Sequence, residues 1–305
     1  MIYKDWLQKW LSVYVEPMKK MRTCKKYSKE INLHIIPKIG GYDMNDLSPL
    51  ILQEFVVDLT SEGFSSNTVN GIISVVKSSI KQALLLDICS SDNSTTIIRP
   101  KANERQVECF TKKEQEQIEK YIIKSKKDKL FGIIICLYTG LRIGELLALR
   151  WDDIDFKTGI MKITRTAIDS WENKKYVKFL QSPKTNSSIR EIPLSKNLIV
   201  KLKELKARSK SVYVVPSKSE HGAEVRSYQK TFELLLKKLK IEHKSFHSLR
   251  HTFATRALEC GIDVKSLSEI LGHKNPTITL NRYVHSMLEY KTEMMNKLGR
   301  LMVIE

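Results

Sequence analysis

The sequence predicts a mainly α-helical protein with a small antiparallel β-sheet, an α+β fold in two domains. Apolar residues recur at helical spacing through most of the 305 residues, and short alternating segments typical of strands are confined to about residues 154–194. A polar stretch separates two helical regions. With 305 residues, of which 42% are hydrophobic and 28% charged, the chain is large enough to form two separate cores. We place the boundary near residue 105, which gives domains 1–105 and 106–305.

The first domain is expected to be a small helical bundle. Apolar periodicity predicts helices over residues 2–15, 24–36, 49–63 and 66–87. The second helix is expected to stop at Pro37, because proline lacks the N–H that an interior helical position donates. Ser48 supplies an N-cap to the third helix, and Pro49 occupies its first position. The fourth helix places these apolar residues on one face: Val69, Ile72, Ile73, Val76, Ile80 and Leu84.

The second domain is expected to combine helices with a cluster of short strands. Residues 90–106 are polar and predict a linker, and Thr111 with Glu114 then forms a capping box for a new helix. Further helices are expected over residues 112–126, 128–139 and 144–149. Strands are expected on both sides of residues 157–159 and over 176–181 and 189–194, and helices again from about residue 195 to the end.

The chain carries a large excess of positive charge. Lys and Arg outnumber Asp and Glu by 52 to 34, a formal net charge of +18 that is spread along the chain. Nucleic acid is the expected partner, because a polyanion attracts such charge. A membrane surface is disfavoured, since the sequence has no long basic amphipathic helix and no lipidation signal. The longest apolar stretch, residues 130–138, is far short of the roughly 20 residues that cross a bilayer, so we expect a cytoplasmic protein.

Neither the cysteines nor the histidines form a pattern typical of a metal site. The five cysteines are scattered and never form a C-x-x-C pair, so we expect no disulfide framework and no zinc ribbon. His247 and His251 have the spacing of the H-E-x-x-H zinc motif, but position 248 is Ser rather than the Glu that acts as base. We therefore predict no metal and no cofactor.

Five short stretches place cations, imidazoles and one tyrosine at expected helix starts or turns. They are TGLRIGE (139–145), SPKTNSSIREIPL (182–194), HSLRH (247–251), LGHKNP (271–276) and LNRYVH (280–285). Taken alone, Arg142 could satisfy the carbonyls of a helix end or pair with Glu145, and His273 could lie beside a helix C-cap. His247 and Arg250 lie three residues apart, so on a helix they share a face and can contact one anion.

The combination of these stretches is more specific than any one of them. Arg142, Lys184, His247, Arg250, His273 and Tyr283 occur in this order, and with their flanking residues they resemble the active site of tyrosine recombinases and phage integrases. The resemblance covers the chain from about residue 107 onward and implies a tyrosine recombinase catalytic domain. The helices before it look like the family's SAM-like, core-type DNA-binding domain.

The chemistry of a phosphodiester explains why these residue types are needed. The bond is anionic and resists attack by an oxygen nucleophile, so the site must neutralise the non-bridging oxygens. Arg142 and Arg250 suit that role, because their planar forks bind phosphate and stay charged. A phenol such as that of Tyr283 has an ordinary pKa of about 10 and needs a base, and His247 is the expected proton acceptor.

The resemblance also assigns the remaining roles. It implies that Lys184, in a turn between strands, protonates the departing 5′ oxygen, and that His273 donates a hydrogen bond to the phosphate. Three lysines just upstream are alternatives to Lys184 as the proton donor: Lys174, Lys175 and Lys178. Glu145 is expected to orient the site rather than to react. The implied product is a 3′-phosphotyrosyl bond to Tyr283. Because one ester is exchanged for another, the chemistry needs neither metal nor ATP.

The expected partner is double-stranded DNA, which the two domains of this family enclose. The family recombines as a homotetramer on two DNA sites, so we expect a monomer or weak oligomer without DNA. Residues 287–301 are the candidate for the carboxy-terminal helix that docks on the next subunit. Proteins that bend DNA or set the direction of recombination are further candidate partners.

Other functions compete with this interpretation. The segment RALECGIDVKSLSEILGH also resembles a helix-turn-helix, which leaves a non-catalytic DNA-binding regulator as an alternative. A type IB topoisomerase shares the chemistry. Within recombinases, a Xer-like resolvase and a DNA invertase are alternatives to the integrase of a phage or conjugative transposon. We favour the integrase because three segments resemble phage and conjugative-transposon enzymes more than Xer proteins: LRWDDIDF, SPKTNSS and LSEILGHKNPTITLNRYVH.

Overall fold

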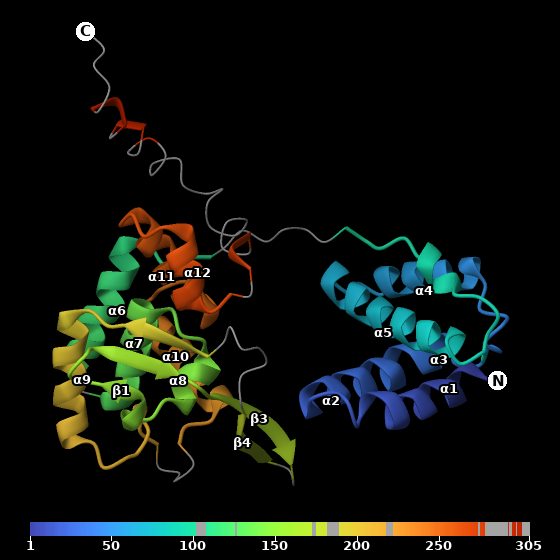
Figure 1. Ribbon diagram of the computed structural model, residues 1–305, viewed down its shortest axis with the longest axis horizontal. Helices are drawn as coiled ribbons and strands as arrows, with labels where there is room; N and C mark the ends of the chain where they lie inside the picture. The colour runs from blue at the N-terminus through green and yellow to red at the C-terminus, as the bar shows by residue number, and fades with distance from the viewer. Residues whose placement is uncertain are drawn as a thin grey trace. The chain divides into compact units, whose positions relative to one another are not determined.

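The computed structural model describes residues 1–101, 108–125, 127–172, 175–181, 189–217, 222–273 and 275–277, with a few positions between 292 and 300. Contacts divide the chain into two compact units, Met1–Arg105 and Gln106–Glu305, and each unit has its own apolar core (Figure 1). Among the described residues, no helix combines the length and the apolar character needed to cross a membrane.

The first unit is a helical bundle whose helices begin at polar caps. The Ser48 hydroxyl accepts a hydrogen bond from the Ile51 N–H at the start of α4, and Ser65 caps α5 in the same way. The predicted cap and proline start of α4 are therefore confirmed. The helices are α1 (Tyr3–Trp10), α2 (Met21–Glu30), α3 (Ile36–Ile39), α4 (Pro49–Ser61) and α5 (Ser66–Leu84). The predicted inward face of α5 is buried except for Leu84, which is 36% exposed.

The predicted helix end at Pro37 is wrong. Helical structure continues through this proline to Ile39. A π-helical turn, Ile31–Ile35, precedes it, and there the Ile36 N–H donates to the Ile31 carbonyl five residues back. This wider turn shifts the hydrogen-bond pattern just where the proline has no N–H to contribute, so the chain stays helical.

The segment after α5 packs on the first unit rather than forming only a linker. Asp92 caps a short 3₁₀ turn, Asn93–Thr96, and Ile97 joins the first core. The Arg99 guanidinium donates to the Asn70 carbonyl and to the Ser74 hydroxyl of α5. The first unit thus extends well into the polar stretch predicted to connect the domains.

The second unit is built around an almost wholly apolar helix, α7 (Phe131–Thr139), which contacts α6, α8 and α11. The predicted capping box is present before α6, because Thr111 and Glu114 each accept a hydrogen bond from the other's backbone N–H. The other helices are α6 (Lys112–Ser125), α8 (Ile143–Ala148), α9 (Lys196–Arg208), α10 (Val225–Lys238), α11 (His247–Glu259) and α12 (Val264–Leu271).

Two small antiparallel sheets accompany these helices. β1 (Ile154–Asp155), β2 (Ile160–Ile163) and β5 (Arg190–Pro193) form one sheet in the order β1-β2-β5, and β3 (Thr166–Glu172) pairs with β4 (Lys175–Gln181) as a separate ribbon (Figure 1). The sequence predicts every strand except β3. That strand is interrupted by charged residues, one of which, Asp169, accepts hydrogen bonds from the first N–H groups of α10 at Val225 and Arg226.

Candidate functional site

Two helix ends carry the motifs singled out in the sequence. α7 ends at Gly140 and α12 at Gly272, and both glycines adopt a left-handed backbone, with φ of 66° and 65°. A side chain at Gly140 would also place a Cβ 2.5 Å from the Phe253 ring. Arg142 follows the first turn as the N-cap residue of α8, and His273 follows the second. The stretches TGLRIGE and LGH therefore each contain a tight turn at the carboxyl end of a helix.

Three arginines from separate elements converge on the carboxyl end of α12. Each donates a side-chain hydrogen bond to a different backbone carbonyl there: Arg190 to Ile270 at 2.6 Å, Arg250 to Leu271 at 2.7 Å and Arg142 to Gly272 at 3.3 Å. The last carbonyls of a helix lack helical partners and carry the negative end of its dipole, so they attract cations. The helix end thus holds several guanidinium groups close together.

Arg250 is the most deeply buried of these arginines, at 1% exposure. Its two terminal nitrogens reach both helix ends, since Nη1 donates to the Gly140 carbonyl at 2.8 Å and Nη2 to the Leu271 carbonyl at 2.7 Å. Carbonyl dipoles hold a guanidinium in place without cancelling its charge. Arg250 therefore links the turn before Arg142 to the turn before His273.

One buried carboxylate joins the other two arginines. Glu145 on α8 accepts a hydrogen bond from Arg142 Nη1 at 2.8 Å, and Arg190 donates to both of its oxygens at 3.1 and 2.9 Å. Burial raises the pKa of Glu145, but the hydrogen bonds and charges of Arg190 and Arg142 outweigh it and lower the pKa from 4.5 to about 2. Because the cluster at this helix end combines three guanidinium groups with this one carboxylate, it is net positive.

The two histidines of HSLRH lie at the start of α11. His247 is exposed and His251 is buried, and their rings meet edge to face with centroids 4.5 Å apart. His247 lies one helical turn before Arg250, as the sequence predicts. In the described part of the chain, no three His, Cys, Asp or Glu side chains are grouped so that they could hold a metal ion.

The structure thus brings Arg142 into contact with Glu145, and it brings Arg142 and Arg250 to the same end of α12. His273 follows directly after the carbonyls that the two arginines bind. Lys184 and Tyr283 lie outside the described residues, so their places in the site stay predictions. The carboxy-terminal helix predicted over residues 287–301 lies largely outside them as well.

Lys178 is an upstream alternative to Lys184 as the proton donor. Burial lowers the pKa of Lys178 to about 8, and the charge of Asp169 only partly offsets this effect. Its Nζ donates to the Leu147 carbonyl at 2.8 Å and lies 4.1 Å from the centroid of the Tyr213 ring. Since Leu147 is at the carboxyl end of α8 and Arg142 is at the amino end, Lys178 is anchored at the opposite end of this helix.

Arg190 was missed as a site residue, although it lies in the stretch SPKTNSSIREIPL. A signal for it exists in the alternation of β5, where Arg190 and Ile192 are buried and Glu191 and Pro193 are exposed. An arginine at an inward-facing strand position needs an anionic partner. Glu145, a lone acid in the apolar run LRIGELLAL, was the available candidate.

The helix α2 of the first unit carries a group of exposed cations. This helix has no fully buried residue, and its outer face carries four exposed cations: Arg22, Lys25, Lys26 and Lys29. Its inner face packs through Tyr27, whose ring stacks on Trp10 at 5.8 Å. Two of these cations, Lys25 and Lys29, line a shallow hollow together with Lys19 and Glu16. Such a surface suits the backbone of a nucleic acid.

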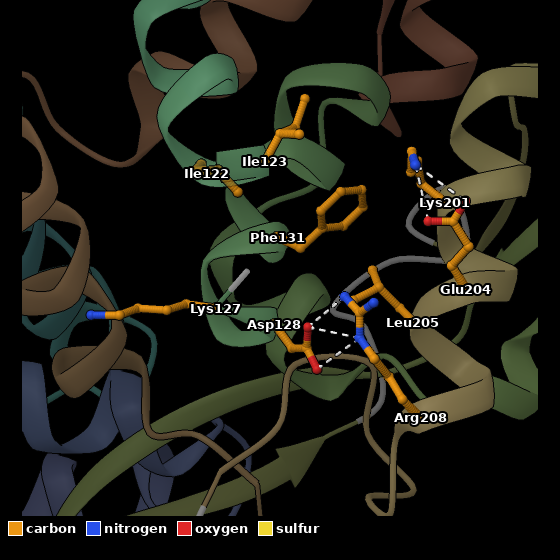
Figure 2. A pocket seen from close by; sticks show the side chains of 9 residues that line it. All are labelled: Ile122, Ile123, Lys127, Asp128, Phe131, Lys201, Glu204, Leu205 and Arg208. Carbon is orange, nitrogen blue, oxygen red and sulfur yellow. Dashed lines mark hydrogen bonds and ion pairs between the residues drawn. The ribbon is translucent and has the colours of Figure 1, made fainter. Parts of the chain in front are cut away.

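A cavity of about 330 Å³ in the second unit has a different character (Figure 2). It lies at the start of α7, the end opposite to Gly140, between α6 and α9. The Phe131 ring lines it, and the ion pairs Arg208–Asp128 and Lys201–Glu204 border it, while Lys127 points away. Positive and negative charges balance at this border, so the cavity is a weaker candidate for a phosphate site than the end of α12.

Comparison with known protein families shows the family to which the chain belongs. A model of the phage integrase family matches residues 108–289, more than half of the sequence, and a model of the N-terminal SAM-like domain of phage integrases matches residues 2–60. The chain belongs to the phage integrase family. It is accordingly a site-specific recombinase, an enzyme of the tyrosine recombinase type that acts on DNA.

Named relatives of this integrase-family chain include recombinases and transposon proteins. It is 28% identical to a "Tyrosine recombinase XerC-like" of Caldanaerobacter subterraneus subsp. tengcongensis, over 98% of this chain and 83% of the relative. It is 26% identical to the "Transposase from transposon Tn916" of Enterococcus faecalis, over 92% of this chain and 73% of the relative.

Solved structures of integrases share the fold of this recombinase. The Tn1549 transposon integrase, in complex with a circular intermediate DNA, matches with a TM-score of 0.82 at 20% identity, over 98% of this chain and 99% of that one. A lambda integrase dimer bound to a core site matches with a TM-score of 0.71 at 18% identity, over 92% and 95% of the two chains. At these identities the likeness concerns the fold.

Proposed function

We propose that this recombinase cleaves and rejoins double-stranded DNA through a 3′-phosphotyrosyl bond to Tyr283, and that it integrates and excises a mobile element. The observation that carries the proposal is the convergence of Arg142 and Arg250 on the carboxyl end of α12. The two motif arginines come from distant parts of the sequence, and the cluster that they form with Glu145 and Arg190 is net positive.

The two arginines suit a scissile phosphate in different ways. Arg250 is buried and fixed by two carbonyls, so its charge is oriented before DNA binds. The side chain of Arg142 is 37% exposed and within reach of a phosphate at the surface. A guanidinium fork on each side can neutralise the non-bridging oxygens as charge redistributes in the transition state. His273, after Gly272, is the proposed third donor to the phosphate.

The proposed reaction moves one proton onto His247 and another onto DNA. The phenolic oxygen of Tyr283 attacks phosphorus while His247, exposed on the face of α11 that carries Arg250, accepts its proton. The bond from phosphorus to the 5′ oxygen breaks, and Lys184 protonates that oxygen. Rejoining reverses these steps with a new 5′ hydroxyl. Bond energy is retained in the ester to Tyr283, so the proposed reaction uses neither metal nor ATP.

We assign DNA recognition to residues 1–105 and catalysis to residues 106–305. The exposed cations of α2 support the first assignment, and the arginine cluster supports the second. We propose that the active form is a homotetramer on two DNA sites. A solved lambda integrase tetramer bound to a Holliday junction has the same fold, with a TM-score of 0.70, which supports this assembly.

The role in a mobile element is supported by relatives of that kind. Besides the Tn916 protein, the "ICEBs1 integrase" of Bacillus subtilis matches 89% of this chain at 24% identity. A resolvase of Xer type is the second candidate, because the XerC-like relative matches 98% of the chain at 28% identity. The integrase and the resolvase differ in the DNA sites that they recombine, because only the integrase joins the ends of an element to a different site.

The proposal is tested on labelled restriction fragments of the DNA that flanks the gene. The unmodified protein should form a covalent protein–DNA adduct on denaturing gels, in EDTA and without nucleotide. Tyr283→Phe should bind the same fragments and form no adduct, because the phenolic oxygen is the attacking atom. An adduct from the Phe variant, or an absolute requirement for a divalent ion in cleavage, would overturn the mechanism.

A further inference from the structure

We propose that Arg190 is a positioning residue of this site: it compensates the charge of Glu145, so that the charge of Arg142 is directed to the DNA phosphate. This inference rests on the proposed function, in which Arg142 binds the scissile phosphate. Arg190 is not one of the six residues by which the sequence resembles a tyrosine recombinase.

The Arg190 side chain contacts more of the Glu145 carboxylate than the Arg142 side chain does. Arg190 donates to both oxygens, whereas the side chain of Arg142 contacts only one of them. Arg190 is 8% exposed, and the exposed fraction of the Arg142 side chain is 37%. Arg190 thus contacts the carboxylate from inside the protein, and the partly exposed Arg142 contacts it from the solvent side.

Charge explains why two arginines are needed for one acid. Glu145 holds Arg142 in place through its carboxylate and also accepts the Arg142 backbone N–H at 3.0 Å. With Arg142 as the only cation beside it, a buried carboxylate would cancel the charge that must attract phosphate. Arg190 supplies a second positive charge on the buried side. Glu145 can then orient Arg142 while the group of three keeps a positive charge.

Arg190 also connects the β1-β2-β5 sheet to the end of α12, where the other two arginines bind. It is the first residue of β5 and pairs with Ile163 of β2, and its Nε donates to the Ile270 carbonyl at 2.6 Å. The next two carbonyls of this end, at Leu271 and Gly272, accept from Arg250 and Arg142. A single side chain thus contacts both α8 and α12, the two elements that must stay in register for phosphate binding.

The first test measures the rate of adduct formation on the labelled flanking DNA. Arg190→Gln should slow it about tenfold, less than the roughly 10²–10³-fold cost of removing a donor that contacts the reacting group. Adding Glu145→Gln should recover part of the rate, because Arg142 then faces no carboxylate and the glutamine amide oxygen can still accept its hydrogen bond. If Arg190 served only to stabilise the fold, the double variant would be as slow as Arg190→Gln or slower, since neither partner of the ion pair remains.

Two further variants control this test. Arg190→Lys keeps the charge without the planar fork and should lie between the unmodified protein and Arg190→Gln. Arg208→Gln removes an arginine from another ion pair of the same unit, with Asp128, and should cleave at the unmodified rate. Equal rates for the unmodified protein and Arg190→Gln would overturn the inference while adduct formation through Tyr283 still stood.

The second test needs neither DNA nor activity. Phenylglyoxal modifies guanidinium groups, and mass spectrometry of the peptide with Arg142 measures its extent. Inorganic phosphate should protect Arg142 in the unmodified protein, should protect it weakly in Arg190→Gln, and should protect it again in Arg190→Gln with Glu145→Gln. Equal protection with and without Arg190, or no protection of Arg142 in the unmodified protein, would refute the inference whatever the outcome of the adduct assay.

Discussion

The two units carry their positive charge in different ways. On α2 of the first unit the cations are exposed, and lysines predominate among them: Arg22, Lys25, Lys26 and Lys29. At the end of α12 in the second unit the cations are arginines, two of them almost fully buried, and each is fixed by carbonyls or by Glu145. Lysine on a flexible stem suits contact with a polyanion at many positions, whereas an anchored guanidinium suits one phosphate in one orientation.

This difference separates affinity from chemistry. Exposed charges raise the strength of DNA binding and its dependence on salt, but they fix no atom with the accuracy that a reaction needs. The buried arginines are already held by the protein, so little reorganisation is required when phosphate arrives. Changes on α2 should therefore alter binding, and changes at the end of α12 should alter cleavage.

Lys184 is the proposed exception to this division, because it is a lysine with a role in the chemistry. Among the changes to cations, its loss should have the largest effect. If Lys184 protonates the departing 5′ oxygen, Lys184→Ala should cleave about 10²–10⁴-fold more slowly. With sulfur in place of the bridging 5′ oxygen, the variant should cleave nearly as fast as the unmodified enzyme, since a thiolate leaves without a proton.

Lys178 provides the matched control for the sulfur experiment. Its Nζ is anchored to the Leu147 carbonyl, so Lys178→Ala should be impaired to the same degree on the oxygen and sulfur substrates. If sulfur rescued Lys178→Ala and not Lys184→Ala, the acid role would pass to Lys178, whose pKa of about 8 suits proton transfer near neutral pH.

Arg250 tests whether an anchored guanidinium is needed rather than a positive charge alone. Arg250→Lys keeps the charge but cannot reach both the Gly140 and Leu271 carbonyls with one planar fork. Adduct formation should fall by about 10²–10³-fold while DNA affinity changes little. The matched control is Arg256→Lys on the same helix, where the arginine bonds to the Phe110 carbonyl and pairs with Glu259. Equal losses in the two variants would indicate a general effect on α11.

The pH dependence of stability tests the arginine cluster without DNA. The pKa of Glu145 is lowered from 4.5 to about 2 in the folded protein, so its ionised form stabilises the fold above about pH 4.5, and this contribution is lost as the pH falls toward 2. Glu145→Gln lacks it. The difference in unfolding free energy between the two proteins should shrink over this window by at most about 3 kcal/mol, since one pKa unit is about 1.4 kcal/mol.

Denaturant unfolding at several pH values measures that difference. Glu204→Gln is the control, because Glu204 pairs with Lys201 at an exposed position where such pairs contribute little. The opposite outcome is a difference in unfolding free energy, between the unmodified protein and Glu145→Gln, that stays constant within experimental error from about pH 6 to about pH 3. That result would mean that the arginines do not hold this carboxylate in its ionised form.

The exposed cations should give the smallest effect, confined to binding. Lys25→Gln with Lys29→Gln removes two cations of the α2 face, and the slope of log affinity against log salt should fall by about 2, roughly 0.9 for each phosphate contact. Filter binding at several salt concentrations measures the slope. Lys203→Gln on the outer face of α9 should leave it unchanged. An unchanged slope in the α2 variant would remove this helix from the proposed DNA surface.

Local signals in the sequence predicted much of the fold. The Ser48 cap, the Thr111–Glu114 capping box and the helix end at Gly140 each depend on neighbouring residues, and each was found. The passage through Pro37 and the strand β3 were missed. The first depends on a π-helical turn, and the second on the fit of Asp169 to the start of α10, so neither follows from local periodicity.

The site shows the same limit. Spacing was sufficient to predict that His247 and Arg250 share a helix face, and the motif glycines were sufficient to place Arg142 and His273 at turns. The role of Arg190 required knowledge of which acid it meets. Arg190 and Glu145 lie 45 residues apart, and only the packing of β5 beside α8 and α12 brings them together.

The central claim is that a covalent bond to Tyr283 carries the DNA between cutting and rejoining. The most direct measurement traps the adduct on a nicked fragment of the flanking DNA in EDTA, digests protein and DNA, and locates the nucleotide on the peptides by mass spectrometry. The account predicts one modified residue, Tyr283, joined to a 3′ phosphate. A nucleotide on Tyr290 or on any other residue, or a bond to a 5′ phosphate, would contradict it.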